Sequence, residues 1–384
     1  MGPELAIITA VSLAGYLIWN HDKNLSKLNK IFKNWGLMAG EALPVFKGKE
    51  GVVYKFKLPM GLVFDQMKAK EDAFNESFPF NAVELDFVGG LLHVIIADQL
   101  PKMLPFKEDM LKGKWSIPIG QSIRGMIYHD FNKIPHILAA GITRYGKTVW
   151  LRLLMLSIIL QQPKQSKLVA IDLKGGLSFM DFEKLKQTHC VASDIAESVE
   201  ALREIADEIK GRQKWFKEKG IQKIQQAGKR QKRVFIIIDE AAQLMSNGRT
   251  GKEKLIYREC ERLLEYIGQV GGGLGFHLIY CTQYPTTKTL PQQVKANCDA
   301  VISFRLRNST ANNVVFDDVG MAEDLPHIPG RAVYQSDRVH EVQVPFVEDD
   351  QILELTKDHL KEDHDAPFVS HKDNTPGANT LVIE

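Results

Sequence analysis

The segment Gly141–Thr148, with the sequence GITRYGKT, constrains the fold of this chain more than any other feature. It follows the apolar run Ile137–Ala140 and precedes the apolar Val149–Leu154, a pattern that predicts a strand, a phosphate-binding loop and a helix. Glycines let backbone N–H groups turn toward phosphates, the lysine reaches the β and γ oxygens, and the threonine hydroxyl can ligate Mg²⁺. The alternative is an ordinary glycine turn that opens a helix. We expect ATP and Mg²⁺ as cofactors, and the predicted nucleotide-binding residues are Gly141, Ile142, Thr143, Arg144, Tyr145, Gly146, Lys147, Thr148 and Val149.

Two adjacent carboxylates, Asp239 and Glu240, follow the apolar run Val234–Ile238. Such a β-branched run is typical of a buried parallel strand. We expect Asp239 to hold Mg²⁺ together with Thr148, and Glu240 to act on the water that attacks the γ-phosphate. Two surface acids after a core strand are the alternative, which the phosphate-binding loop upstream disfavours.

Other expected strands also end in polar residues. Lys167–Ile171 leads into Asp172–Gly176, and Phe276–Cys281 leads into Thr282 and Gln283. Ligands of open α/β sheets bind at the carboxyl ends of the strands, so these ends are candidates for the site. Gln283 can sense the γ-phosphate or orient water through its amide. The predicted catalytic residues are Lys147, Glu240 and Gln283.

The order of these motifs resembles the FtsK/SpoIIIE branch of the FtsK–HerA motor ATPases. The matching segments are 136–148, 171–174, 238–244, 275–285 and 294–304. The resemblance implies an α/β, RecA-like P-loop NTPase with a mostly parallel sheet and helices on both faces. It further implies a homohexameric ring that moves double-stranded DNA by ATP hydrolysis. Arg144-Tyr145 is similar to the loop variant of relatives on conjugative plasmids and other mobile elements of Gram-positive bacteria.

The chain departs from the chromosomal members of this family where they carry an arginine, after the Ala300–Phe304 strand. Here the stretch is Thr310–Val314, so we consider Arg305 and Arg307, slightly upstream, as the residues that reach a neighbouring subunit's nucleotide. Most exposed arginines have no catalytic role, which is the alternative.

Composition and residue pattern divide the chain into six segments. A strand at Val52–Leu58 and two more around Gly89-Gly90 predict a small α/β accessory domain before the motor, which in relatives stacks as its own ring layer. The predicted segments are an apolar anchor at 1–22, a basic linker or helix at 23–50, the accessory domain at 51–100, a connector at 101–120, the motor domain at 121–347, and an acidic helix with a disordered tail at 348–384.

The first segment contains the uncharged run Leu5–Trp19. Fifteen helical residues rise about 22 Å, which is short for a hydrocarbon core of about 30 Å. Lysines follow this run, which places the carboxyl side in the cytoplasm. We expect a single-pass protein of the cell membrane with a cytoplasmic motor, and the alternative is a soluble helix that packs on the protein.

The net charge of +2 gives no strong overall field, so any affinity for DNA must come from local patches. One candidate is the basic stretch Lys210–Arg233, which we expect to be helical and which includes Arg212 and Lys214. The second is the loop Ser246–Lys252 with Arg249 and Lys252, a candidate pore element. A solvated helix face is the alternative for the first. The four cysteines have no metal-ligand spacing, and we expect reduced thiols.

Together these features predict an ATPase that pumps duplex DNA without reading its sequence. The most specific expectation is the coupling or transfer motor of a conjugative plasmid or other mobile element, with a relaxase or secretion channel as a possible partner. One alternative is a replication or packaging ATPase of a phage or plasmid. Another, from a different class, is a scaffold whose assembly is switched by ATP.

Overall fold

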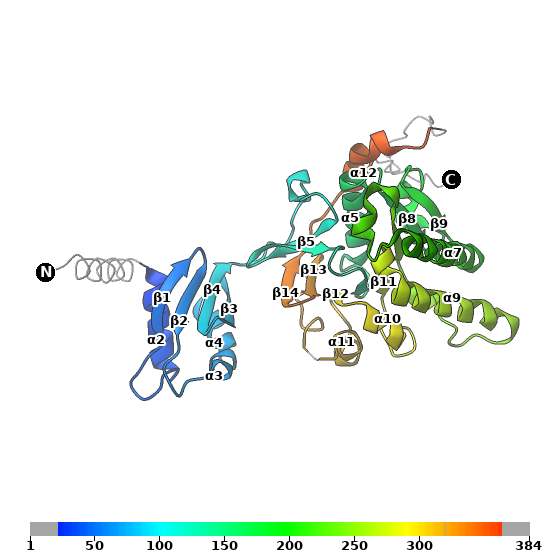
Figure 1. The fold of residues 1–384 in the computed structure, drawn as a ribbon. Coiled ribbons are helices and arrows are strands. Elements are labelled where there is room, and N and C mark those ends of the chain that lie inside the picture. Colours follow the sequence, from blue (N-terminus) through cyan, green and yellow to red (C-terminus); the bar gives the residue numbers. More distant parts are fainter. Residues whose placement is uncertain (1–21, 319, 363–384) are drawn as a thin grey trace, which may run out of the picture.

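Two β-sheets organise the chain in the computed structural model, which describes residues 22–318 and 320–362 (Figure 1). The smaller sheet has the strand order β1-β2-β4-β3, and the larger one has the order β6-β5-β14-β13-β12-β7-β11-β10-β8-β9. The strands of the smaller sheet are β1 (Val45–Glu50), β2 (Val53–Lys57), β3 (Asn81–Val88) and β4 (Leu91–Asp98). Those of the larger sheet are β5 (Ser116–Ser122), β6 (Gly125–Asp130), β7 (Ile137–Ala140), β8 (Ser166–Ile171), β9 (Thr188–Ala192), β10 (Arg233–Ile238), β11 (Phe276–Thr282), β12 (Ala300–Phe304), β13 (Arg331–Gln335) and β14 (Val339–Gln343).

The helices connect these strands and cover them. In the first unit they are α2 (Lys23–Asn34), α3 (Phe64–Lys68) and α4 (Glu71–Ser77). In the second they are α5 (Lys147–Gln161), α6 (Met180–Glu183), α7 (Ile195–Lys219), α8 (Ile224–Ala227), α9 (Gly251–Val270), α10 (Gln292–Asn297), α11 (Ser309–Phe316) and α12 (Asp349–Thr356).

Six strands of the larger sheet, from β12 to β9, run parallel, as the apolar runs predict. Every residue of β7, β10 and β11 is buried. Successive side chains of a strand point to opposite faces, so β10 supplies Ile236 to one core and Ile237 to the other. Helices α7 and α9 pack on the first face, and α5 and α12 pack on the second. The mostly parallel sheet with helices on both faces is therefore confirmed.

An antiparallel extension lies beside β12 and was not expected from the sequence. Strands β13 and β14 form a hairpin, and β14 leads to a second hairpin of β5 and β6. Because β5 begins at Ser116, the larger domain starts before residue 121, and the predicted connector at 101–120 is too long. Helix α12 follows this extension and packs on α5, where Ile352 is fully buried.

The accessory unit also begins earlier than predicted. The segment 23–50, expected to be a linker, contributes α2 and β1 to this unit. Leu28 and Phe32 of α2 belong to the same buried cluster as Phe56 of β2, because α2 carries an apolar stripe at helical spacing. The turn between β3 and β4 uses Gly89 and Gly90 with φ of +60° and +78°, which a two-residue hairpin favours.

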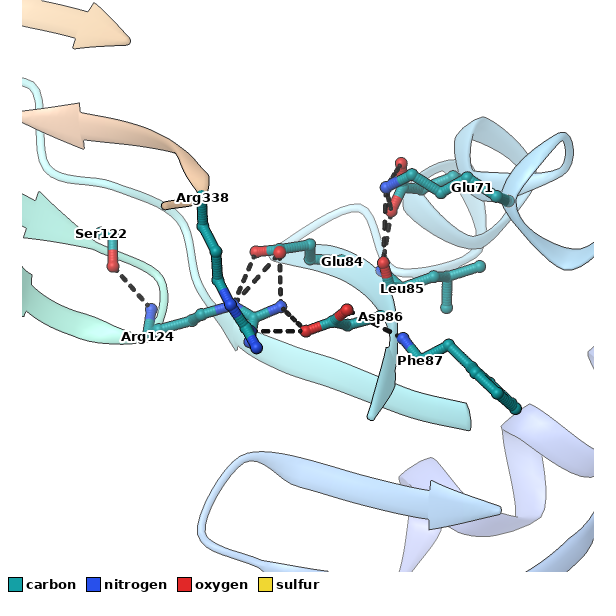
Figure 2. A network of polar contacts seen from close by, with 9 residues as sticks. Glu71, Glu84, Leu85, Asp86, Phe87, Ser122, Arg124 and Arg338 are labelled. Atoms are coloured by element: carbon teal, nitrogen blue, oxygen red, sulfur yellow. Dashed lines mark hydrogen bonds and ion pairs between the residues drawn. The ribbon is translucent and has the colours of Figure 1, made fainter. Parts of the chain in front are cut away.

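The accessory unit and the larger domain meet through an ion-pair network, shown in Figure 2. Glu84 and Asp86 of β3 face Arg124 of the β5–β6 hairpin, and Asp86 also faces Arg338 of the β13–β14 hairpin. We call these four residues the interdomain ion-pair network. The extension of the larger sheet thus carries the surface on which the accessory unit rests.

Within residues 22–318 and 320–362, no helix is long and apolar enough to cross a membrane. The predicted anchor at Leu5–Trp19 and the predicted disordered tail lie outside the described residues.

Candidate functional site

The loop between β7 and α5 has the geometry of a phosphate cradle. Gly141 adopts a φ of +148°, and a Cβ placed there would approach Phe304 Cβ to 2.6 Å. Its backbone N–H donates to Thr282 O at 3.3 Å, and that of Ile142 donates to Arg305 O at 3.1 Å. A glycine is required at Gly141 by both its conformation and the close approach of β12.

The end of this loop is fastened to the segment before β13. Gly146 has a φ of +107°, and Arg144 is a non-glycine residue at +72°. The carbonyl of Tyr145 accepts a hydrogen bond from the Gly330 amide at 2.9 Å, and the Tyr145 hydroxyl lies 2.6 Å from His327 Nδ1. The predicted loop residues thus form a turn held by neighbours on both sides, with Arg144 exposed at its tip.

Lys147 begins α5, and its side chain is almost fully buried. Its ammonium donates to the Asp239 carbonyl at 2.6 Å and lies 3.8 Å from Asp239 Oδ1 and 3.7 Å from Glu240 Oε2. A cation between two carboxylates at the floor of a cavity is suited to receive phosphate oxygens there. The predicted site residues Lys147, Asp239 and Glu240 therefore lie together.

Thr148 and Asp239 form a pair of hard oxygen ligands. The threonine hydroxyl lies 3.3 Å from Asp239 Oδ1, and Asp239 Oδ2 lies 3.5 Å from the Ser178 hydroxyl. Mg²⁺ prefers such oxygens and usually keeps several waters alongside one or two carboxylates and substrate phosphates. The residues present fit this ion, with Thr148 and Asp239 as the side chains that would hold it.

Glu240 is buried and oriented by the end of β11. Its Oε1 accepts from the Thr282 hydroxyl at 3.0 Å, and its Oε2 accepts from the Gln283 backbone N–H at 2.9 Å. Gln283 itself lines the cavity that also contains Lys147 and Asp239. A carboxylate held by two donors has a fixed direction, which is what a residue that acts on water needs.

Strand order explains why these groups meet. Strand β11 lies between β7 and β10, and Tyr280 pairs with Ile238 in parallel register. Thr282 and Glu240 each lie two residues beyond that pair, so they are level at the carboxyl edge of the sheet. The register of β10 with β8, in which Ile238 pairs with Ile171, likewise brings Asp172 beside Asp239.

Lys174 and Ser178, which follow β8, join the site, although neither was assigned a role of its own from the sequence. Asp172 accepts hydrogen bonds from the amides of Lys174 and Ser178, which folds this loop toward β10. Lys174 Nζ then lies 3.8 Å from Asp239 Oδ2, and Ser178 contacts the same carboxylate. The polar residues after this strand were a signal of the site, but their partner depends on strand order.

A cavity of about 570 Å³ adjoins this site, and Lys147, Thr148 and Asp239 are among the residues that line it. This volume lies within the range of small-molecule sites, about 300–1,000 Å³. Its lining includes the phosphate-binding loop, Lys174, Asp239 and Gln283, together with residues of the connector and of the segment after β14. The connector residues Lys102 and Met103 were not expected at the site.

The two candidate trans arginines differ in their surroundings. Arg305 is half-buried and donates to the carbonyl of Leu325 in its own chain. Arg307 is exposed. Of the two, Arg307 is therefore better placed to reach another subunit, and its role stays a prediction.

Arg212 is not available to DNA, which corrects one prediction. Its guanidinium is buried, donates to the carbonyls of Lys232 and Leu274 at 2.8 and 2.9 Å, and pairs with Glu208. Burial lowers the pKa of Arg212, and Glu208 opposes this effect. The side chain ties α7 to two loops and has a structural role.

The basic stretch at 210–233 is also not one helix. Helix α7 ends at Lys219, with Gly220 in the left-handed conformation as its cap, and Arg233 is a buried residue of β10. Lys214 is exposed on α7. Arg249 and Lys252 lie together at the start of α9, where Arg249 pairs with Glu253 and stacks on a tyrosine ring.

Residues 101–342 match the FtsK/SpoIIIE family. The DNA translocase FtsK of Streptococcus agalactiae is 28% identical over 296 residues, which are 70% of this chain and 35% of that protein. The DNA translocase FtsK of Lactococcus lactis subsp. cremoris is 26% identical over 381 residues, 91% of this chain and 49% of that protein. The chain thus spans about a third to a half of the length of these curated relatives.

Solved structures share the fold. The pCW3 conjugation coupling protein TcpA, in a monomer form with ATPγS, superposes with a TM-score of 0.64 at 22% identity, covering 88% of this chain and 99% of that one. ATPases 2 and 3 of EssC from Geobacillus thermodenitrificans give a TM-score of 0.58 at 17% identity, covering 68% and 52%. The family match covers more than half of the sequence and includes the whole phosphate site. The chain therefore belongs to the FtsK/SpoIIIE family, and its larger domain is a P-loop ATPase domain of that family.

Proposed function

We propose that this chain is an ATP-driven translocase of duplex DNA. The observation that carries the proposal is the joint placement of Lys147, Thr148, Asp239 and Gln283 around one cavity in a domain of the FtsK/SpoIIIE family. Glu240 is hydrogen-bonded to the Gln283 amide beside them. The named relatives are DNA translocases.

The site supports hydrolysis as well as binding. Lys147 binds the β- and γ-phosphates, and its ammonium offsets their charge. Glu240, fixed by Thr282 and the Gln283 amide, orients a water in line with the γ-phosphate and takes up its proton. The Gln283 amide senses the γ-phosphate. Mg²⁺ bound by Thr148 and Asp239 would neutralise charge on the phosphate oxygens.

The candidate DNA surface follows directly from the hydrolytic residues. After Glu240 the chain makes one short 3-10 turn at Ala241–Leu244 and then the loop with Arg249 and Lys252. Asn247 of this loop donates to the carbonyl of Lys288, an exposed cation in the loop that follows Gln283. Strands β10 and β11, which precede Glu240 and Gln283, therefore each lead to a basic loop, and the two loops are neighbours. These loops would contact the phosphates of DNA without reading its bases.

A ring of six copies fits this arrangement. A translocase needs several subunits around the DNA, and Arg307 would supply positive charge at the neighbour's γ-phosphate. The accessory unit would form a second layer, and Leu5–Trp19 would attach the assembly to the cell membrane. Conjugative transfer is the favoured setting, because TcpA, a conjugation coupling protein, shares the fold over 88% of this chain. A relaxase or secretion channel would then be the partner.

ATP hydrolysis by the full chain, measured alone, with single-stranded DNA and with duplex, tests the proposal. We expect strong stimulation by duplex that is lost in Lys147→Ala and Glu240→Gln, followed by displacement of a triplex strand. Hydrolysis that ignores every DNA would refute the translocase.

Two alternatives give different results. A replication or packaging ATPase of a phage or plasmid would share the stimulation by DNA but would not sediment with membranes through residues 1–20. If the protein is an ATP-switched scaffold, the Glu240→Gln variant should still assemble normally, because this variant keeps its nucleotide and loses only ATP turnover.

A further inference from the structure

We propose that the base of the bound nucleotide lies between Met103 of the connector and Phe346, so that nucleotide binding fastens the connector to the ATPase domain. This inference rests on the proposed function, since it assigns the part of the same cavity that the phosphates would leave free. The two side chains belong to segments near the two ends of the ATPase domain, more than two hundred positions apart in the sequence.

Two large apolar side chains are exposed at this cavity. Met103 is 56% exposed and Phe346 is 38% exposed, and both line the cavity that holds the phosphate-binding loop. Isolated exposed apolar residues are ordinary, but a thioether and an aromatic ring at one end of a phosphate site are suited to a flat heterocycle. Base-to-aromatic stacking accepts any base, so the proposed contact strengthens binding without selecting the base.

The backbone holds these two segments together. The Phe346 amide donates to the Leu104 carbonyl at 2.7 Å, and the Phe106 amide donates to the Phe346 carbonyl at 2.8 Å. These bonds make a short parallel pairing of Pro105 with Phe346. The backbone of Phe346 is therefore held by the connector, two residues along the chain from Met103 at its Pro105 partner.

A buried arginine ties the connector to the phosphate-binding loop. Arg331 donates to the carbonyls of Leu100 and Pro101 at 3.3 and 3.1 Å and to Gln343 Oε1 at 3.1 Å. Gln343 in turn donates to the carbonyl of Pro329, the residue before Gly330, whose amide donates to the Tyr145 carbonyl. The phosphate end and the proposed base end of the cavity thus share one hydrogen-bonded frame.

The test compares ATP with inorganic tripolyphosphate, which offers the phosphates without a base. Calorimetric titration of the full chain should show that Met103→Ala and Phe346→Ala each raise the Kd for ATP about 10-fold, equivalent to about 1.4 kcal/mol. The Kd for tripolyphosphate should stay within about twofold, since the phosphate groups are untouched. Phe80→Ala, at an exposed ring of the accessory unit, is the matched control and should change neither value.

Hydrogen exchange provides a second readout that does not depend on activity. ATP should protect the amides of Lys102, Met103, Leu104 and Phe106, whereas tripolyphosphate should protect the phosphate-binding loop alone. The inference is overturned if wild type and both variants bind ATP equally while Lys147→Ala loses it, or if ATP leaves the connector amides unprotected. A wild-type chain that binds neither ligand would overturn the proposed function, and this inference with it.

Discussion

Arg124 is the residue whose removal should most directly release the accessory unit from the ATPase domain. Its Nε and NH2 groups contact Glu84 at 3.1 and 2.6 Å, and NH2 also contacts Asp86 at 3.0 Å (Figure 2). Arg338 adds a contact of 3.0 Å to Asp86. Arg124→Gln removes two of these three ion pairs and leaves the β5–β6 hairpin otherwise intact.

The size of the effect follows from geometry and exposure. The side chains of Arg124, Glu84 and Asp86 are 23%, 33% and 26% exposed, so solvent screens them in part. Partly exposed pairs contribute about 0.2–1 kcal/mol each, and paired contacts from one guanidinium lie at the upper end. Two pairs give about 1.5 kcal/mol of docking free energy, which corresponds to a roughly tenfold rise in the undocked fraction.

Protease cleavage of the segment between β4 and β5 (residues 99–115) reports this fraction, provided that docking is fast compared with cleavage. For wild type we expect cleavage to accelerate as NaCl rises from 0.1 to 1 M, because the screening length falls from about 10 Å to about 3 Å. Arg124→Gln should be cleaved about ten times faster at low salt and should respond little to added salt. Arg203→Gln, which breaks an exposed pair within the ATPase domain, is the matched control. Equal, salt-independent cleavage of wild type and Arg124→Gln would refute the reasoning.

Three further predictions concern the ATPase domain. Thr282→Val removes a buried donor to Glu240, so we expect kcat for ATP to fall about 10-fold while nucleotide affinity holds, measured by steady-state hydrolysis and titration. Gly141→Ala forces a Cβ against Phe304 at 2.6 Å, and we expect a loss of about 2 kcal/mol in denaturant unfolding together with weaker ATP binding. Burial lowers the pKa of His136 to about 4, so the unfolded chain takes up a proton that the folded chain refuses, and unfolding free energy should fall as the pH drops from about 6.5 toward 4.

Each of these has a matched variant. Thr282→Ser keeps the hydroxyl and should retain most of kcat, and an equal loss in Ser and Val would contradict the proposed hydrogen bond. Gly273→Ala meets nothing within 4 Å and should be nearly neutral. His136→Asn keeps an acceptor for the Leu278 amide but cannot titrate, so its unfolding free energy should depend less on pH than that of wild type. Identical pH dependence in both proteins would exclude His136 as the source.

Sequence patterns predict the parallel half of the sheet well, because buried parallel strands are apolar along their whole length. Every residue of β10 is buried, and the adjacent Asp239 and Glu240 mark its end. The antiparallel hairpins were missed because β14 and β5 share little pairing and carry polar residues at their ends. Lys174 was given no role for a related reason, since its approach to Asp239 depends on the order of β8 and β10 and not on local sequence.

The burial of Arg212 follows from its position on the apolar stripe of α7. Helix α7 buries Leu202, Ile205, Ile209 and Phe216, and Arg212 falls between the last two at the same alternating spacing of three and four. A residue on that stripe faces the core whatever its charge, and a buried guanidinium then requires acceptors such as the carbonyls of two nearby loops. Lys214 lies off the stripe and is exposed, as its position requires. Charge along the chain identified the basic stretch, but helical period decides which members reach solvent.

Two series of contacts link the phosphate site to other parts of the molecule. One passes from Glu240 through the 3-10 turn to the loop with Arg249, and the other passes from Tyr145 through Gly330 and Arg331 to the connector. Contact alone does not establish coupling, which requires that both ends bias one equilibrium. A double-mutant cycle of Glu240→Gln with Met103→Ala measures this, with connector protection by ATP as the readout. Additive effects would mean that the routes act separately. A coupling free energy of about 1 kcal/mol would mean that Glu240 and Met103 are coupled through the bound nucleotide.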